Sequence, residues 1–65
     1  MASQVTTFCK VDEAELLRLW HTARIAGAVS RYDRLQYASR EFNKANPGVS
    51  KMAAYLYLDG VTRGY

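Results

Sequence analysis

Residues 47–59, Pro-Gly-Val-Ser-Lys-Met-Ala-Ala-Tyr-Leu-Tyr-Leu-Asp, decide how the second half of the chain folds. The proline and glycine at its start end any preceding helix, because proline disfavours the α conformation in the residue before it and glycine tolerates positive φ. Ser50 offers a side-chain oxygen to the free amides of a new helix. An apolar run then forms the body of that helix, and Gly60 is placed to end it. We therefore predict a helix over about residues 51–59, entered through a tight turn.

Two capping-box patterns predict further helices upstream. In each pattern a helix-capping residue stands three positions before an acidic residue, as in Asp12–Glu15 and Ser30–Asp33. We expect the first helix to begin directly after the first cap.

The second helix is expected to run from about residue 31 to about residue 45, where Asn-Pro-Gly follows. Gly27 separates the two helices in this interpretation. A single helix over residues 13–45 stays open as the alternative, because one interior glycine costs only about 1 kcal/mol.

Apolar residues recur in both upstream segments with the spacing of a buried helix face. The predicted core residues of the first helix are Leu16, Leu17, Leu19, Trp20 and Ala23. Those of the second are Tyr32, Leu35, Ala38, Phe42 and Ala45. The fold class is therefore all-α, a three-helix bundle.

Residues 1–11 are rich in β-branched residues, and we expect an extended arm there, with Phe8 as its anchor on the helices. The three-helix domain is expected to span residues 12–60. Residues 61–65 would form a short tail with irregular structure.

The composition narrows the possible functions. The chain has 65 residues, enough for one domain, with one cysteine and one histidine, so neither a disulfide framework nor a metal cluster is expected. No apolar leader or membrane-spanning run is present in the sequence, and we expect a cytoplasmic protein without a membrane partner. No nucleophile, base and orienting group share a motif, and His21 is expected at the surface. We predict a protein without enzymatic activity, catalytic residues or cofactors.

The positive charge is concentrated in the middle of the chain. Residues 31–51 carry five cations and two carboxylates, which leaves the whole formal charge of +3 there, and the flanking segments each balance to zero. A basic segment of this kind is the electrostatic footprint that nucleic-acid binding requires. A solvated basic helix face is the alternative.

Residues 48–58, Gly-Val-Ser-Lys-Met-Ala-Ala-Tyr-Leu-Tyr-Leu, resemble the turn and recognition helix of resolvase- and repressor-type helix-turn-helix domains. Ala38 and Phe42 resemble the apolar pair of the helix before that turn. The resemblance implies a helix-turn-helix-like fold with three core positions at Val49, Ala54 and Leu58. It also implies that the protein binds DNA as a small regulator of transcription.

The residues expected to contact DNA divide into two groups. Phosphate contacts would come from Arg31, Arg34, Arg40 and Lys44. Major-groove contacts would come from Ser50, Lys51 and Tyr55 at the start of the third helix.

Two features depart from the helix-turn-helix pattern. Five residues, 43–47, separate Phe42 from Gly48, so the turn is longer than the family's. The exposed face of the third helix would also carry Met52, Tyr55 and Leu56 in place of side chains that read bases. Met52, Leu56 and Tyr57 are the residues expected at an interface with another protein. Apolar helix faces often bind other proteins, so the second hypothesis is a protein-interaction module, such as an inhibitor or adaptor, with a homodimer as one of its forms.

Overall fold

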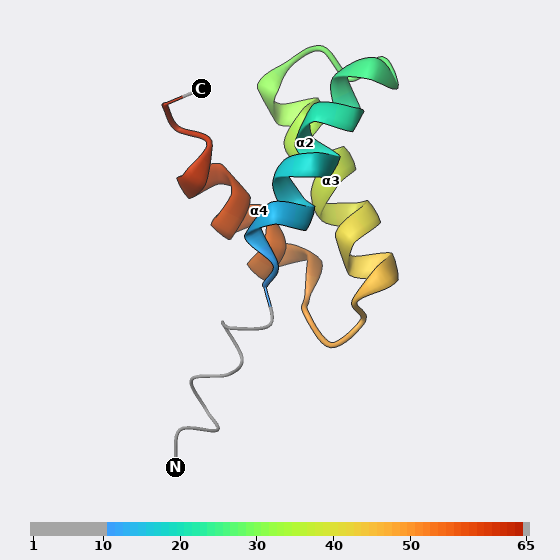
Figure 1. Cartoon of the computed structure of the whole chain (residues 1–65), viewed down its shortest axis with the longest axis vertical. Coiled ribbons are helices and arrows are strands. Elements are labelled where there is room, and N and C mark those ends of the chain that lie inside the picture. The colour runs from blue at the N-terminus through green and yellow to red at the C-terminus, as the bar shows by residue number, and fades with distance from the viewer. Residues whose placement is uncertain (1–10, 65) are drawn as a thin grey trace.

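The computed structural model describes residues 11–64 and contains three helices and no strand in that range. The helices are α2 (Glu13–Ile25), α3 (Arg31–Ala45) and α4 (Lys51–Val61). α2 and α3 run antiparallel, and α4 lies beside this pair (Figure 1). α3 packs against both other helices, whereas α2 and α4 touch over a small area. The predicted all-α three-helix bundle is confirmed, while residues 1–10 of the predicted arm, with its anchor Phe8, lie outside the described residues.

All three predicted N-caps are confirmed by their hydrogen bonds. Asp12 Oδ1 accepts from the Glu15 amide, Ser30 Oγ from the amide three residues on, and Ser50 Oγ from the Ala53 amide, each at 3.1 Å. Each bond satisfies one of the free amides that every helix exposes at its start. The sequence therefore determines where each helix begins.

Residues 13–45 form two helices, which decides between the two alternatives left open above. Gly27 has a φ of +104°, a conformation that side-chain-bearing residues rarely adopt. The Ala28 amide donates to the Ala23 carbonyl at 2.9 Å, so the chain reverses directly after α2.

α4 continues past the point where we expected it to end. Gly60 lies inside the helix, which reaches Val61, and the buried Thr62 serves as its C-cap. The Thr62 hydroxyl donates to the Leu58 carbonyl at 2.7 Å, and Arg31 of α3 donates to the Thr62 carbonyl at 3.0 Å. These contacts stabilise a last turn that glycine alone would terminate, so the first residues of the supposed tail belong to the folded domain.

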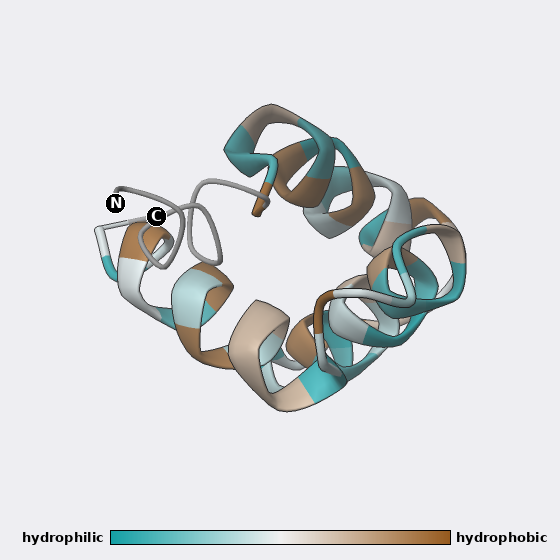
Figure 2. Ribbon diagram, turned by 90° about the horizontal axis from the view of Figure 1, so that it is seen from below, coloured by the Kyte–Doolittle hydropathy of each residue, from teal (hydrophilic) through white to brown (hydrophobic). Residues whose placement is uncertain are grey.

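The core lies along α3, between α2 and α4, and hydrophobic residues occur along all three helices (Figure 2). The buried hydrophobic residues are Val11, Leu16, Leu19, Trp20, Ala23, Leu35, Ala38, Phe42, Val49, Ala54 and Leu58. The three core positions implied by the helix-turn-helix resemblance are among them. Leu17 is half-buried and packs against this cluster.

Two predicted core residues of α3 are exposed. Tyr32 has 61% of its surface accessible, and Ala45 is exposed at the last residue of the helix. The buried row of α3 includes Ser39 instead, because its hydroxyl donates to the Gln36 carbonyl at 3.2 Å and needs no solvent. Val11, which we had placed in the arm, is also buried.

Two asparagines hold the connection between α3 and α4. Asn46 donates from its side chain to the Phe42 carbonyl at 3.1 Å, and its own carbonyl accepts from the Val49 amide at 2.9 Å. The Asn43 side chain donates to the Val49 carbonyl. The connection therefore has a defined shape that brings α4 back along α3.

Candidate functional site

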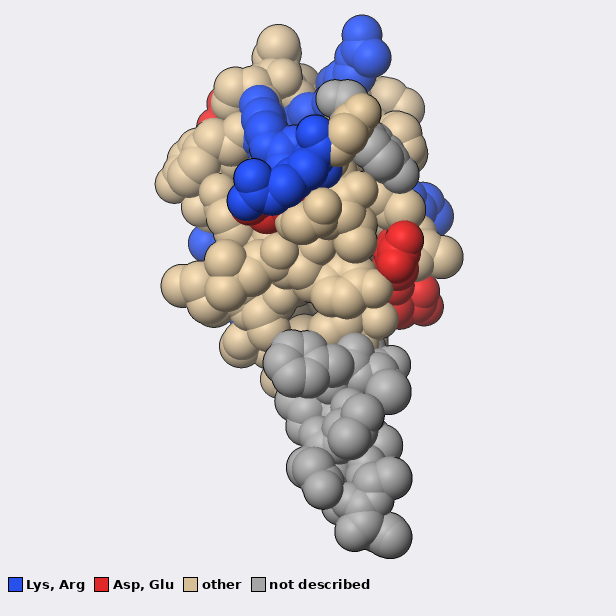
Figure 3. Space-filling model, turned by 90° about the vertical axis from the view of Figure 1, so that its left-hand side faces the viewer, with Lys and Arg blue, Asp and Glu red and all other residues tan. Residues whose placement is uncertain are grey.

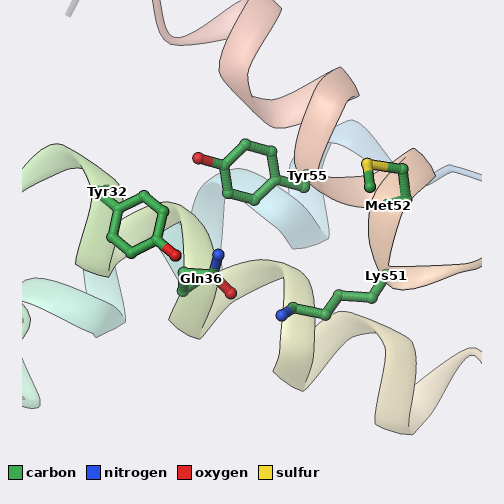
Figure 4. A pocket seen from close by; sticks show the side chains of 5 residues that line it. All are labelled: Tyr32, Gln36, Lys51, Met52 and Tyr55. Atoms are coloured by element: carbon green, nitrogen blue, oxygen red, sulfur yellow. The ribbon is translucent and has the colours of Figure 1, made fainter.

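An open groove lies between α3 and α4 on the surface of the bundle. Its volume is about 270 Å³, and its lining residues are Tyr32, Gln36, Lys51, Met52 and Tyr55. In Figure 4 the Tyr55 side chain extends from α4 toward Tyr32, and the Lys51 side chain extends toward Gln36. The groove thus has one wall from each of the two helices.

Helical spacing explains how these residues come together. Tyr32 and Gln36 are four residues apart on α3, and Lys51 and Tyr55 are four apart on α4, so each pair lies on one side of its helix. The short connection makes the two helices antiparallel neighbours, which places the two rows opposite each other.

The outer side of α4 beside the groove is apolar. Met52 and Leu56, four residues apart, have 66% and 60% of their surface exposed. We use the name α4 face for Lys51, Met52, Tyr55 and Leu56. Lys51 is the only charged residue of this face and of the groove lining within residues 11–64.

Arg31 was expected to bind phosphate, but its guanidinium joins α3 to the C-terminal end of α4. It donates to the Asp59 carbonyl at 2.8 Å and to Asp59 Oδ1 at 2.7 Å, in addition to its bond to Thr62. The hydrogen bond from Arg31 lowers the pKa of the Asp59 carboxyl, and Arg63 lowers it further. These bonds give Arg31 a structural role at the end of α4.

Arg34, the second expected phosphate contact, joins α3 to α2. Its guanidinium lies 4.0 Å from the centre of the Trp20 ring and donates to the Trp20 carbonyl at 3.2 and 3.3 Å. Burial, and to a lesser extent the nearby Arg24, lower the pKa of Arg34. The Nε and Nη2 groups of Arg34 therefore hold α3 against α2.

The other expected DNA contacts differ in how far they are engaged within the described part of the chain. Lys44 forms an ion pair with Glu41 at 3.2 Å, and the Ser50 hydroxyl oxygen accepts the N-cap bond. Arg40 and Lys51 are exposed, and neither forms an ion pair within residues 11–64. Tyr55 is half-buried in the groove.

Tyr57, predicted as an exposed interface residue, is half-buried and connects α4 to α2. Its hydroxyl donates to Glu13 Oε1 at 2.9 Å, and this bond is the main cause of its raised pKa. Of the predicted interface residues, Met52 and Leu56 therefore lie on the α4 face and Tyr57 does not.

The α4 side of the molecule has an uneven charge distribution. Figure 3 shows Lys and Arg side chains gathered toward one end of this side, an uncharged surface below them, and Asp or Glu side chains at the right-hand edge of that surface. Arg63 contributes to the charge at the C-terminal end of α4, where it pairs with Asp59 at 3.1 Å.

Sequence reasoning missed two lining residues of the groove. It assigned Tyr32 to the core and gave Gln36 no role. Their spacing of four residues on α3 is the signal that could have paired them, but only the direction of α4 shows which side of α3 stays uncovered.

Neither a metal site nor a membrane-spanning helix is found among residues 11–64. No three potential metal-ligating side chains gather in this range, and none of its helices has the length and apolar character needed to cross a membrane.

Comparison of the chain with protein-family models, with curated proteins and with solved structures returns no match. The described residues thus define a small all-α bundle with an open groove between its last two helices.

Proposed function

We propose that this protein is a protein-interaction module, which binds the apolar side of a partner's helix in the groove between α3 and α4. The observation that carries the proposal is the exposure of Met52 and Leu56 directly beside that groove. Exposed apolar patches next to a concave surface are typical of protein-binding sites.

The chemistry of the groove matches recognition of an amphipathic helix. Such a ligand places apolar side chains at spacings of three and four residues, which can enter a groove between two helices. Met52 offers a flexible, polarisable side chain, while Tyr32 and Tyr55 supply aromatic surface with hydroxyls that can stay hydrated. The long Lys51 stem covers further apolar surface while its amino group remains in water.

DNA binding through α3, the turn and α4 is the second candidate. Its support is the formal charge of +3 and the exposed Arg40 and Lys51 near the connection. It ranks second because Arg31 and Arg34 donate to carbonyl groups and the α4 face offers one cation for a phosphate or base.

A displayed library of helical peptides tests the first candidate. The full chain is used to select binders, which are then titrated against wild type and Leu56→Asp by fluorescence anisotropy. We expect selected peptides with apolar residues three and four apart, whose affinity falls at least about tenfold in Leu56→Asp, because a charge would be buried at the contact. Leu56 is exposed, so this variant keeps its fold, which circular dichroism verifies.

An exposed apolar residue far from the groove provides the matched control. Ile25, with 87% of its surface accessible, lies at the end of α2, and Ile25→Asp should bind the selected peptides like wild type. Equal binding by Leu56→Asp would contradict the proposal. A concentration-dependent dimer that Leu56→Asp abolishes would show instead that a second copy of the chain occupies the face.

The second candidate predicts a different result. Binding to random duplex DNA should weaken with salt at a slope of about −0.9 per phosphate neutralised. Loss of that binding in Arg40→Gln and Lys51→Gln, together with no peptide binding, would favour DNA as the ligand.

A further inference from the structure

The C-terminal end of α4 carries a net positive charge, formed by Arg31, Arg63 and Asp59. Asp59 accepts from Arg31 through Oδ1 at 2.7 Å and from Arg63 through Oδ2 at 3.1 Å. Two guanidinium groups share one carboxylate, so this triad has a formal charge of +1. The Arg63 side chain is 74% exposed, which leaves it accessible to a ligand.

A second cation stands at the other end of the same row of residues. Lys51, Tyr55 and Asp59 follow each other at intervals of four on α4, and Arg63 pairs with the last of them. Lys51 is exposed and forms no ion pair within the described part of the chain. Lys51 thus lines the groove, and the Arg63–Asp59 pair lies one helical turn beyond Tyr55, outside the groove lining.

The helix geometry sets the spacing of the two α4 positions at which these charges lie, Lys51 and Asp59. Asp59 stands eight positions after Lys51, so a rise of 1.5 Å per residue puts these two positions about 12 Å apart along α4, and the Arg63 guanidinium lies 3.1 Å from the Asp59 carboxylate. Carboxylates on one side of a ligand helix have this separation when they are about seven or eight residues apart. The lining residues of the groove include no acidic side chain that would repel them.

We infer that the partner's helix carries two acidic side chains about seven or eight residues apart, one for Lys51 and one for Arg63, with apolar side chains between them. This inference rests on the proposed function, because it names the chemistry of the helix that the groove accepts. The apolar stretch supplies most of the contact, while the two charges select the partner and fix its register.

The charge pattern of the selected peptides tests this inference. We expect binders selected with wild type to be enriched in Asp or Glu at two positions about seven or eight residues apart. Selection with the double variant Lys51→Glu, Arg63→Glu should shift these two positions to Lys or Arg. Replacement of either acidic residue of a selected peptide by Gln should weaken binding to wild type by about threefold to fivefold, and high salt should remove this difference.

Matched variants separate charge from folding. Lys44→Glu changes an exposed cation on α3 and should leave the selected charge pattern unchanged. Arg63→Gln removes the cation without introducing a carboxylate beside Asp59, and should lower the preference at one position only.

The possible failures are distinguishable. Peptides that bind in a Leu56-dependent way, without acidic enrichment or without the shift in the charge-reversed variant, would overturn the inference and leave the proposed function standing. Selection that yields no peptide sensitive to Leu56→Asp would overturn both.

Discussion

α3 packs against α2 on one side and against α4 on the other, and the contact with α4 leaves a groove at the surface. Toward α2 the contact is sealed, because Trp20 is buried under the Arg34 guanidinium, which also donates to the backbone. Toward α4 the contact is held at one end by Arg31, core residues such as Phe42 and Leu58 fill its interior, and a groove stays open at its surface. Arg31 and Arg34, which were expected to bind phosphate, hold the closed regions together, and the open region is the site that we propose for a ligand.

The two sides of α4 also differ, because one side is buried in the core and the other is exposed. Leu58 of α4 is completely buried, whereas Leu56, two residues earlier, is 60% exposed. A surface that retains large apolar side chains stabilises the fold little and is available for a partner. The following predictions test this contrast, beginning with the largest expected effect.

Leu58→Ala should lower the free energy of unfolding by about 2–5 kcal/mol, because it leaves a cavity in the core. Leu56→Ala on the exposed side should change it by less than about 0.5 kcal/mol. Urea denaturation of both variants measures the difference. Similar losses for the two would mean that α4 buries both of its sides.

Arg34→Gln should cost about 1–2 kcal/mol of unfolding free energy. The substitution removes the stacking on Trp20 and the charged hydrogen bonds to the Trp20 carbonyl. Arg40→Gln, an exposed position on the same helix, is the control and should have almost no effect. An Arg34 variant as stable as wild type would show that the Arg34–Trp20 contacts do not stabilise the packing of α2 against α3.

Arg31→Gln should cost less than about 1 kcal/mol, since the guanidinium is partly exposed and water can replace its bonds. Its effect should concentrate at the end of α4, where Asp59 and Thr62 lose their donor. Hydrogen exchange of the last α4 amides should then be faster, while exchange in α2 stays unchanged. Uniform acceleration along the chain would contradict this local role.

Acid should weaken the Arg31–Asp59 ion pair and so lower the free energy of unfolding by a small amount. The pKa of Asp59 is lowered in the folded state, first by the hydrogen bond from Arg31, so its contribution is present at neutral pH. It is lost as the pH falls below about 4 and through the lowered pKa, when the carboxyl takes up a proton. Asp59→Asn should lack this part of the acid dependence, measured as the difference between the two unfolding curves at pH 3 and pH 7. Equal pH dependence in both proteins would show that the Arg31–Asp59 pair contributes nothing measurable.

The local chemistry of the chain predicted its helices well. Asp12, Ser30 and Ser50 each cap the helix that their spacing indicated, because the capping bond reaches only three residues along the chain. The end of α4 could not be predicted in this way. It depends on Arg31, 28 residues away from Asp59 in the sequence, whose bonds hold a turn that contains Gly60.

The candidate site was predicted only in part. Met52 and Leu56 were correctly placed on an exposed apolar surface, since their neighbours Ala54 and Leu58 fill the core side. The roles of Arg31 and Arg34 were not foreseen, because a sequence pattern shows a cation but not the carbonyl to which it donates.

An NMR titration of the full ¹⁵N-labelled chain tests the central claim most directly. One sample receives a peptide selected on wild type, and the other receives random duplex DNA at low salt. The account expects peptide-induced shifts at Gln36, Met52, Tyr55 and Leu56, with little change around Trp20 and with weak, scattered changes from DNA. Strong DNA-induced shifts centred on Arg40, Lys44 and Lys51, without any peptide effect on the α4 face, would contradict it.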